Sequence, residues 1–172
     1  MSGRLGDGAD VVVGRAVLHH VPMAEYLLGK LPPLLRPGTR LGFLEPDFRS
    51  PLARLAHLEA TTNPEYACLR VWATAINELY LARRISPAVG ATLGRTLEIA
   101  GYRNVRSTYY EFPTDKLVLE NIVMFYDEVR GPLASYGILS SAENDEQQRL
   151  LRALPPGPHP GVWGMHRVVA EV

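Results

Sequence analysis

The chain has little cysteine, little lysine and no excess of charge of either sign. Its 172 residues include a single cysteine, Cys68, so no internal disulfide can form and a reduced, cytoplasmic setting is expected. Eighteen basic residues balance eighteen acidic residues. Broad nucleic-acid binding needs an excess of lysine and arginine to neutralise phosphates, so this balance argues against a nucleic-acid partner.

Long apolar runs are missing as well. No stretch approaches the ~20 apolar residues that a membrane-spanning helix needs, and the N-terminal residues lack the apolar core of a signal peptide. We therefore expect no membrane partner. The length suits one domain over residues 1–172, which is large enough to fold without a metal ion or a disulfide.

Short runs rich in β-branched and aromatic residues predict strands. Residues 11–13, three valines in a row, are apolar without alternation, which is typical of a strand covered on both faces of a sheet. Further strands are predicted over residues 40–45, where Pro46 would end the strand, and over residues 105–112 and 162–172.

Between these predicted strands, apolar residues recur at the spacing of an α-helix. Pro32 and Pro33 should distort the last turn of the first helix, Asn63-Pro64 marks a break within the second helical region, and Gly101 should close a later helix. Strands alternate with helices in the first part of the chain, which predicts an α/β fold with parallel crossovers. The expected helical segments are 23–35, 51–84, 87–100, 116–130 and 141–154.

Three segments together resemble the C-terminal half of a class I S-adenosylmethionine-dependent methyltransferase. Residues 9–21 (ADVVVGRAVLHHV) resemble the fourth strand of the family and the cofactor-contacting turn after it. Residues 34–45 (LLRPGTRLGFLE) resemble the helix, Pro-Gly turn and fifth strand, and residues 100–105 (AGYRNV) the passage into the sixth strand. The resemblance implies a partial Rossmann-like sheet of family strands 4, 5, 7 and 6, with the seventh antiparallel, and a helical insertion or lid over residues 51–84.

The glycine-rich cofactor loop of that family has no counterpart in this sequence. Glycines let the backbone approach a ligand closely, and a carboxylate after the next strand accepts hydrogen bonds from the ribose. No G-x-G-x-x-G-like run occurs in the chain. The resemblance therefore implies half of a site for S-adenosylmethionine, and we expect the isolated chain to bind this cofactor weakly or not at all.

The strand at residues 11–13 would then lie at an open edge of the sheet, although its composition suits the middle. An unprotected edge strand offers unpaired backbone groups to another chain. Two interpretations follow: the chain is a fragment of a longer methyltransferase, or it pairs through this edge with a full-length enzyme or in a homodimer.

Candidate site residues follow the first two predicted strands. By resemblance, Gly14, Arg15 and Ala16 lie near the methionine part of the cofactor, although a plain tight turn would explain the same residues. His19 and His20 cannot easily ligate one metal, because successive side chains point in different directions, so no metal site is expected. They either pack at the junction of strand and helix or line the cofactor or substrate pocket.

General-base candidates are His20, Glu45 and Asp47. An imidazole titrates near neutral pH, and either carboxylate could hold a substrate or take its proton, unless the two acidic residues simply lie in a solvated loop. The sequence thus predicts methyl transfer to a small molecule with an oxygen, nitrogen or carbon nucleophile. Its alternatives are a non-catalytic partner subunit and a distant α/β binding domain without this chemistry.

Overall fold

The computed structural model describes residues 10–61, 66–155 and 157–172. The chain divides into two compact units. The first comprises Met1–Asp47, Ala88–Tyr110 and Met165–Val172, and the second comprises Phe48–Pro87 and Glu111–Gly164. The helices expected at residues 51–84 thus lie in one unit with the segment from Glu111 to Gly164.

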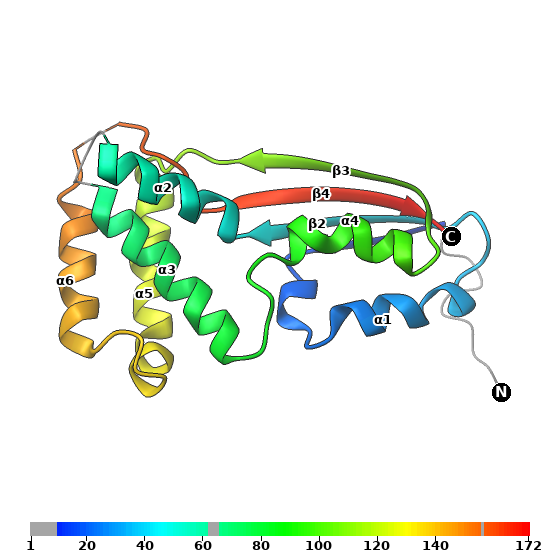
Figure 1. Cartoon of the computed structure of the whole chain (residues 1–172), viewed down its shortest axis with the longest axis horizontal. Helices are drawn as coiled ribbons and strands as arrows, with labels where there is room; N and C mark the ends of the chain where they lie inside the picture. Colours follow the sequence, from blue (N-terminus) through cyan, green and yellow to red (C-terminus); the bar gives the residue numbers. More distant parts are fainter. Residues whose placement is uncertain (1–9, 62–65, 156) are drawn as a thin grey trace. The chain divides into compact units, whose positions relative to one another are not determined.

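The first unit is built on a four-stranded mixed sheet (Figure 1). Strands β1 (Val11–Arg15) and β2 (Arg40–Asp47) are parallel, with Val11 opposite Arg40. The arrow of β4 (Gly164–Glu171) points against those of β2 and β3 (Arg103–Glu111) in Figure 1. The order across the sheet is β1-β2-β4-β3, so the last strand along the chain lies between the second and the third.

Helices cover one face of this sheet. Helices α1 (Ala24–Lys30) and α4 (Val89–Ile99) share an apolar core with β2 and β4. Successive side chains of a strand point to opposite faces of the sheet, so every second strand residue faces this core. This core includes Leu28, Leu41, Phe43, Leu93, Leu97 and Val168.

The other face of β1 is exposed. The side chains of Val11 and Val13 are 54% and 78% exposed, whereas Val12 between them packs against the core of the unit. The prediction of a strand covered on both faces is therefore wrong for the described residues, because the helices of this unit pack against one side only. Among the described strands, β1 pairs only with β2, so its other edge has no strand beside it.

The second unit is helical. It contains α2 (Arg49–Thr61), α3 (Ala67–Ala82), α5 (Lys116–Ser135) and α6 (Ser141–Arg152). Trp72 of α3 is buried in the core of this unit, and its ring centroid lies 5.4 Å from that of Phe125 and 5.0 Å from that of Tyr126. The apolar face of α3 packs into this core, where all of its large residues are buried: Leu69, Trp72, Ile76, Leu79 and Tyr80.

Several predicted boundaries need correction. Pro46 does not end its strand, and β2 continues to Asp47. Helix α4 begins at Val89, two residues beyond Pro87, and α5 continues through Pro132 to Ser135. The predicted distortion at Pro32 is confirmed, because a 3₁₀ turn, η2 (Pro32–Leu34), follows α1. The break expected at Asn63-Pro64 lies outside the described residues.

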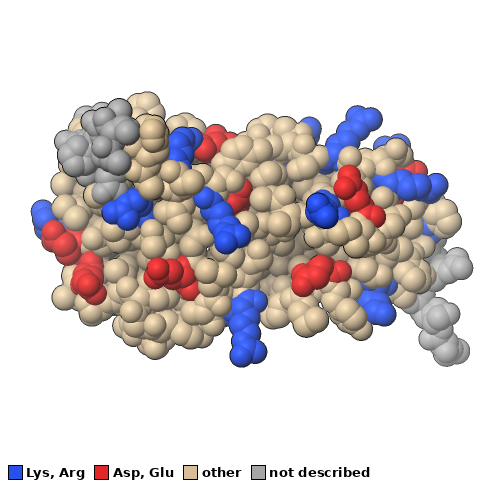
Figure 2. All heavy atoms as spheres, in the orientation of Figure 1, with Lys and Arg blue, Asp and Glu red and all other residues tan. Residues whose placement is uncertain are grey.

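Surface charge is mixed in sign. Figure 2 shows lysine and arginine side chains interspersed with aspartate and glutamate over the face that it displays. Among the described residues, no helix combines the length and the apolar character needed to cross a membrane.

Candidate functional site

Glu45 fixes the turn that follows β1. Its side chain is fully buried, and its carboxylate accepts hydrogen bonds from the backbone N–H groups of Val17 (2.9 Å), Leu18 (3.1 Å) and His19 (3.3 Å). The His19 Nδ1 lies 3.3 Å from the same carboxylate. These N–H groups open the short 3₁₀ helix η1 (Leu18–His20), so the carboxylate takes the place of an N-terminal cap.

The pKa of Glu45 is lowered despite its burial. Burial alone would raise the pKa, because it penalises the charged form. The hydrogen bonds from the His19 side chain and from the three backbone N–H groups outweigh that penalty. Glu45 is therefore ionised and weakly basic, which favours a positioning role over proton abstraction.

Gly14 and Arg15 are strand residues and not part of a tight turn. They are the last two residues of β1, and the Ala16 N–H extends the pairing by donating to the Leu44 oxygen at 2.9 Å. A Cβ added at Gly14 would lie 2.8 Å from the Phe43 ring, so close packing against this ring favours glycine there. The chain turns at Ala16, whose φ of 49° lies in the left-handed region.

The two adjacent histidines have different surroundings. His19 is buried beside Glu45, whereas His20 is exposed, and their ring centroids are 3.8 Å apart. The packing interpretation fits His19, and His20 remains accessible to a ligand. Over the ranges that the structure covers, no group of three or more His, Cys, Asp or Glu side chains could hold a metal ion.

Asp47 belongs to a second polar cluster on the same sheet. Its carboxylate is fully buried at the end of β2 and lies 3.5 Å from His166 Nε2. The other ring nitrogen of His166 lies 3.2 Å from the Ser107 Oγ of β3, and the Tyr109 ring centroid is 5.0 Å from that of His166. The alternative of a solvated loop for Glu45 and Asp47 is wrong, because both side chains are buried within β2.

Sequence reasoning missed His166 and Ser107. The signal that could have found them is the strand order, since β4 runs antiparallel and its first residues meet the carboxyl ends of β2 and β3. With alternate residues on one face, His166 then falls beside Asp47 and Ser107.

The contacts of His166 with Asp47 and Ser107 suit an imidazole that accepts a proton. A carboxylate at Nε2 favours the tautomer that carries its proton on that nitrogen, and Nδ1 is then the acceptor facing the Ser107 hydroxyl. Ser107 is exposed, so a ligand can reach this end of the cluster. Both the Glu45 turn and the Asp47 cluster lie at the edge of the sheet where the parallel strands β1 and β2 end.

Comparisons with known proteins return a distant likeness. No family model matches the chain, and no curated protein is significantly similar to it. Among solved structures, the chain is similar to phospholethanolamine N-methyltransferase 2 of Haemonchus contortus, solved with phosphomonomethylethanolamine and S-adenosylhomocysteine. The TM-score is 0.43 at 10% identity, and the match covers 94% of this chain and 33% of that one, so the chain spans about a third of that protein's length.

Proposed function

We propose that this chain carries part of the cofactor and acceptor site of an S-adenosylmethionine-dependent methyltransferase. The acceptor would be a small molecule with an oxygen, nitrogen or carbon nucleophile. The observation that carries the proposal is the order β1-β2-β4-β3, with the antiparallel β4 between two parallel strands. This is the order that the sequence resemblance implies for family strands 4, 5, 7 and 6.

The turn after β1 would form one wall of the cofactor site. S-adenosylmethionine supplies an activated methyl group when bound. Gly14, Arg15, Ala16 and His19 sit at the carboxyl end of β1, where ligands of open α/β sheets bind. The fit is partial, because Glu45 already occupies the N–H groups of the turn and the sequence has no glycine-rich loop.

The acceptor would bind beside Asp47 and His166. Alignment dominates a displacement at carbon, and a base helps when the nucleophile carries a proton. His166 would take that proton at Nδ1, the nitrogen that faces the exposed Ser107, while the buried Asp47 stabilises the charged imidazolium. His20, which is exposed at the neighbouring turn, is the other accessible imidazole at this edge.

Amide chemical shifts of the ¹⁵N-labelled chain test the proposal. Millimolar S-adenosylhomocysteine should shift the N–H signals of Arg15, Ala16 and His19, and Glu45→Gln, which frees the turn, should remove these shifts. Glu98→Gln, an exposed control in the same unit, should leave them intact. Shifts that fall elsewhere in the chain but not on this turn, or that are unchanged in Glu45→Gln, would count against a cofactor site here.

A second candidate function is favoured by the open edge of β1. Val13 is 78% exposed on a strand with one neighbour in the described structure, and such an edge offers backbone groups to another strand. The chain would then be a non-catalytic partner subunit that pairs through β1. Light scattering after size exclusion should show a discrete dimer that Val13→Lys weakens at least about tenfold, because lysine on an edge strand opposes pairing. A monomer at all concentrations would reject self-pairing.

A further inference from the structure

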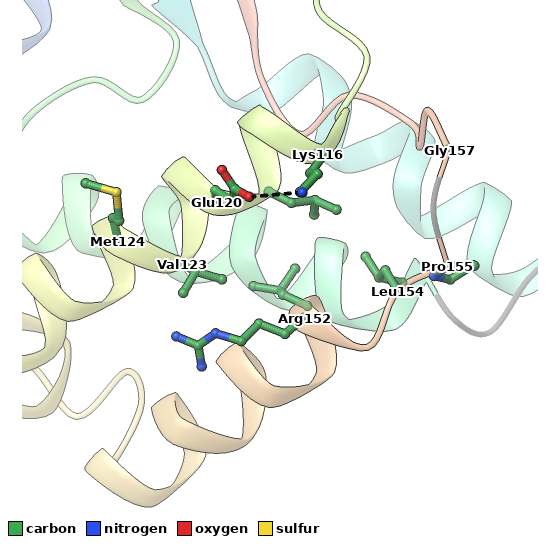
Figure 3. A pocket seen from close by; sticks show the side chains of 10 residues that line it. Lys116, Glu120, Val123, Met124, Arg152, Leu154, Pro155 and Gly157 are labelled. Atoms are coloured by element: carbon green, nitrogen blue, oxygen red, sulfur yellow. Dashed lines mark ion pairs between the residues drawn. The ribbon is translucent and has the colours of Figure 1, made fainter.

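A cavity of about 620 Å³ opens in the helical second unit. It lies between α5, the end of α6 and Leu154, Pro155 and Gly157 (Figure 3). Its volume falls within the roughly 300–1,000 Å³ that is typical of small-molecule sites. Neither the methyltransferase proposal nor the edge of β1 uses it.

The floor of the cavity is apolar. Leu119 and Val123 of α5 are four residues apart and so share one face of the helix, and Leu151 and Leu154 close the opposite side. Leu151 and Val123 are buried, so the floor belongs to the packed core of the unit. An apolar ligand body would replace water over this surface.

The charged side chains at the rim sum to one positive charge. Lys116 and Glu120 of α5 face each other, with Nζ and Oε1 3.9 Å apart, and so largely offset one another. Arg152 is the third charged residue that lines the cavity, and its side chain lies beside Val123 in Figure 3. Asp127, which does not line the cavity, interacts electrostatically with Arg152 but also pairs with Arg130 at 3.5 Å. The lining itself keeps one net positive charge and so favours a ligand that carries one negative charge.

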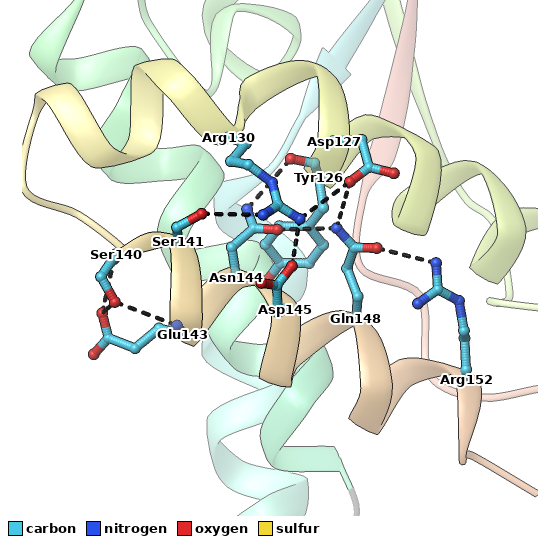
Figure 4. A network of polar contacts seen from close by, with 10 residues as sticks. All are labelled: Tyr126, Asp127, Arg130, Ser140, Ser141, Glu143, Asn144, Asp145, Gln148 and Arg152. Carbon is cyan, nitrogen blue, oxygen red and sulfur yellow. Dashed lines mark hydrogen bonds and ion pairs between the residues drawn. The ribbon is translucent and has the colours of Figure 1, made fainter.

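A buried amide holds the Arg152 guanidinium in place. Gln148 is 3% exposed, and its oxygen accepts from Arg152 at 3.0 Å (Figure 4). The Gln148 nitrogen donates to Asp127 at 2.8 Å and to Asn144 at 3.0 Å, which ties the arrangement to both helices. A guanidinium carries five N–H donors, and in the described structure that of Arg152 makes one hydrogen bond, so donors remain for a carboxylate.

We infer that this cavity binds a small apolar carboxylic acid. The ligand's hydrocarbon body packs on Leu119, Val123, Leu151 and Leu154, and its carboxylate takes paired hydrogen bonds from Arg152. The inference is independent of the proposed methyl transfer, because every residue that it uses belongs to the second unit.

Binding of decanoate and of its neutral analogue decanol tests the inference. We expect decanoate to shift the methyl signals of the four floor residues and to bind at least about tenfold more tightly than decanol, as a charge-assisted pair implies. Arg152→Gln should remove that preference while leaving decanol binding little changed.

Arg149→Gln provides the matched control. Arg149 lies one turn before Arg152 on α6, is exposed and pairs with Glu146 at 2.6 Å outside the cavity. Circular dichroism would verify that each variant is folded. The inference is overturned by equal affinities for the two probes, by unchanged decanoate binding in Arg152→Gln, by equal losses in both arginine variants, or by no binding at millimolar decanoate.

Discussion

Glu45→Gln should destabilise the first unit more than any exposed charge change. The carboxylate accepts hydrogen bonds from three backbone N–H groups and faces His19. A glutamine amide has only one acceptor oxygen, and its NH2 group would face N–H groups with which it cannot form hydrogen bonds. Hydrogen bonds to a charged group contribute about 1.5–3 kcal/mol each and neutral ones about 1 kcal/mol, so the substitution should cost roughly 2–4 kcal/mol. That is a large part of the 5–15 kcal/mol by which domains are usually stable.

The pH dependence of this loss has a defined sign. The folded pKa of Glu45 is lowered, so its contribution is fully present above the unfolded pKa, near 4.3, and disappears as the pH falls through the folded value. The difference in unfolding free energy between the native chain and Glu45→Gln should therefore be largest above about pH 5 and shrink below about pH 4.

Urea unfolding at several pH values measures both effects. Glu98→Gln, with an exposed side chain, should change the unfolding free energy by less than about 0.5 kcal/mol. A loss in Glu45→Gln no larger than that of the control, or one that grows as the pH falls, would refute the assignment of Glu45 as the carboxylate that holds the turn.

Four further substitutions, in three tests, probe other features of the chain. Ala16→Gly should raise the melting temperature, because left-handed backbone costs alanine about 1–2 kcal/mol, and an unchanged or lower value would contradict this. Asp47→Asn and His166→Gln should be non-additive by about 1 kcal/mol or more in a double-mutant cycle of urea unfolding, whereas additive losses would mean that the two side chains do not interact. Tyr126→Phe should be neutral or stabilising by up to about 1 kcal/mol, because the buried hydroxyl has no hydrogen-bond partner among the described residues, and a larger loss in thermal unfolding would reveal an unseen partner.

The strands and helices were largely predictable because local signals suffice for them. Each signal affects only the few residues around it. The examples are the valines of β1, the proline pair after α1, and Gly101, whose φ is +88°. The end of β2 was not predictable in this way. Asp47 is buried and lies beside His166 of β4, a strand that is far away in the sequence but adjacent in the sheet.

In the candidate site too, only the features that depend on neighbouring residues could be predicted from the sequence. Gly14 to His19 could be placed from a contiguous motif, whereas the partnership of Glu45 with the turn joins residues 26 to 28 positions apart. His166 and Ser107 are 59 positions apart and meet only because β4 enters the sheet between β2 and β3. Such pairings depend on strand order, which the family resemblance implied but which no local residue pattern encodes.

Calorimetric titration of S-adenosylmethionine into the 172-residue chain tests the central claim most directly. On the proposal, residues 14–19 would supply one wall of the site. The sequence has no glycine-rich loop to supply the other wall, so any binding should be no tighter than millimolar, about −4 kcal/mol. A dissociation constant in the micromolar range would contradict the claim that this chain holds only part of a cofactor site.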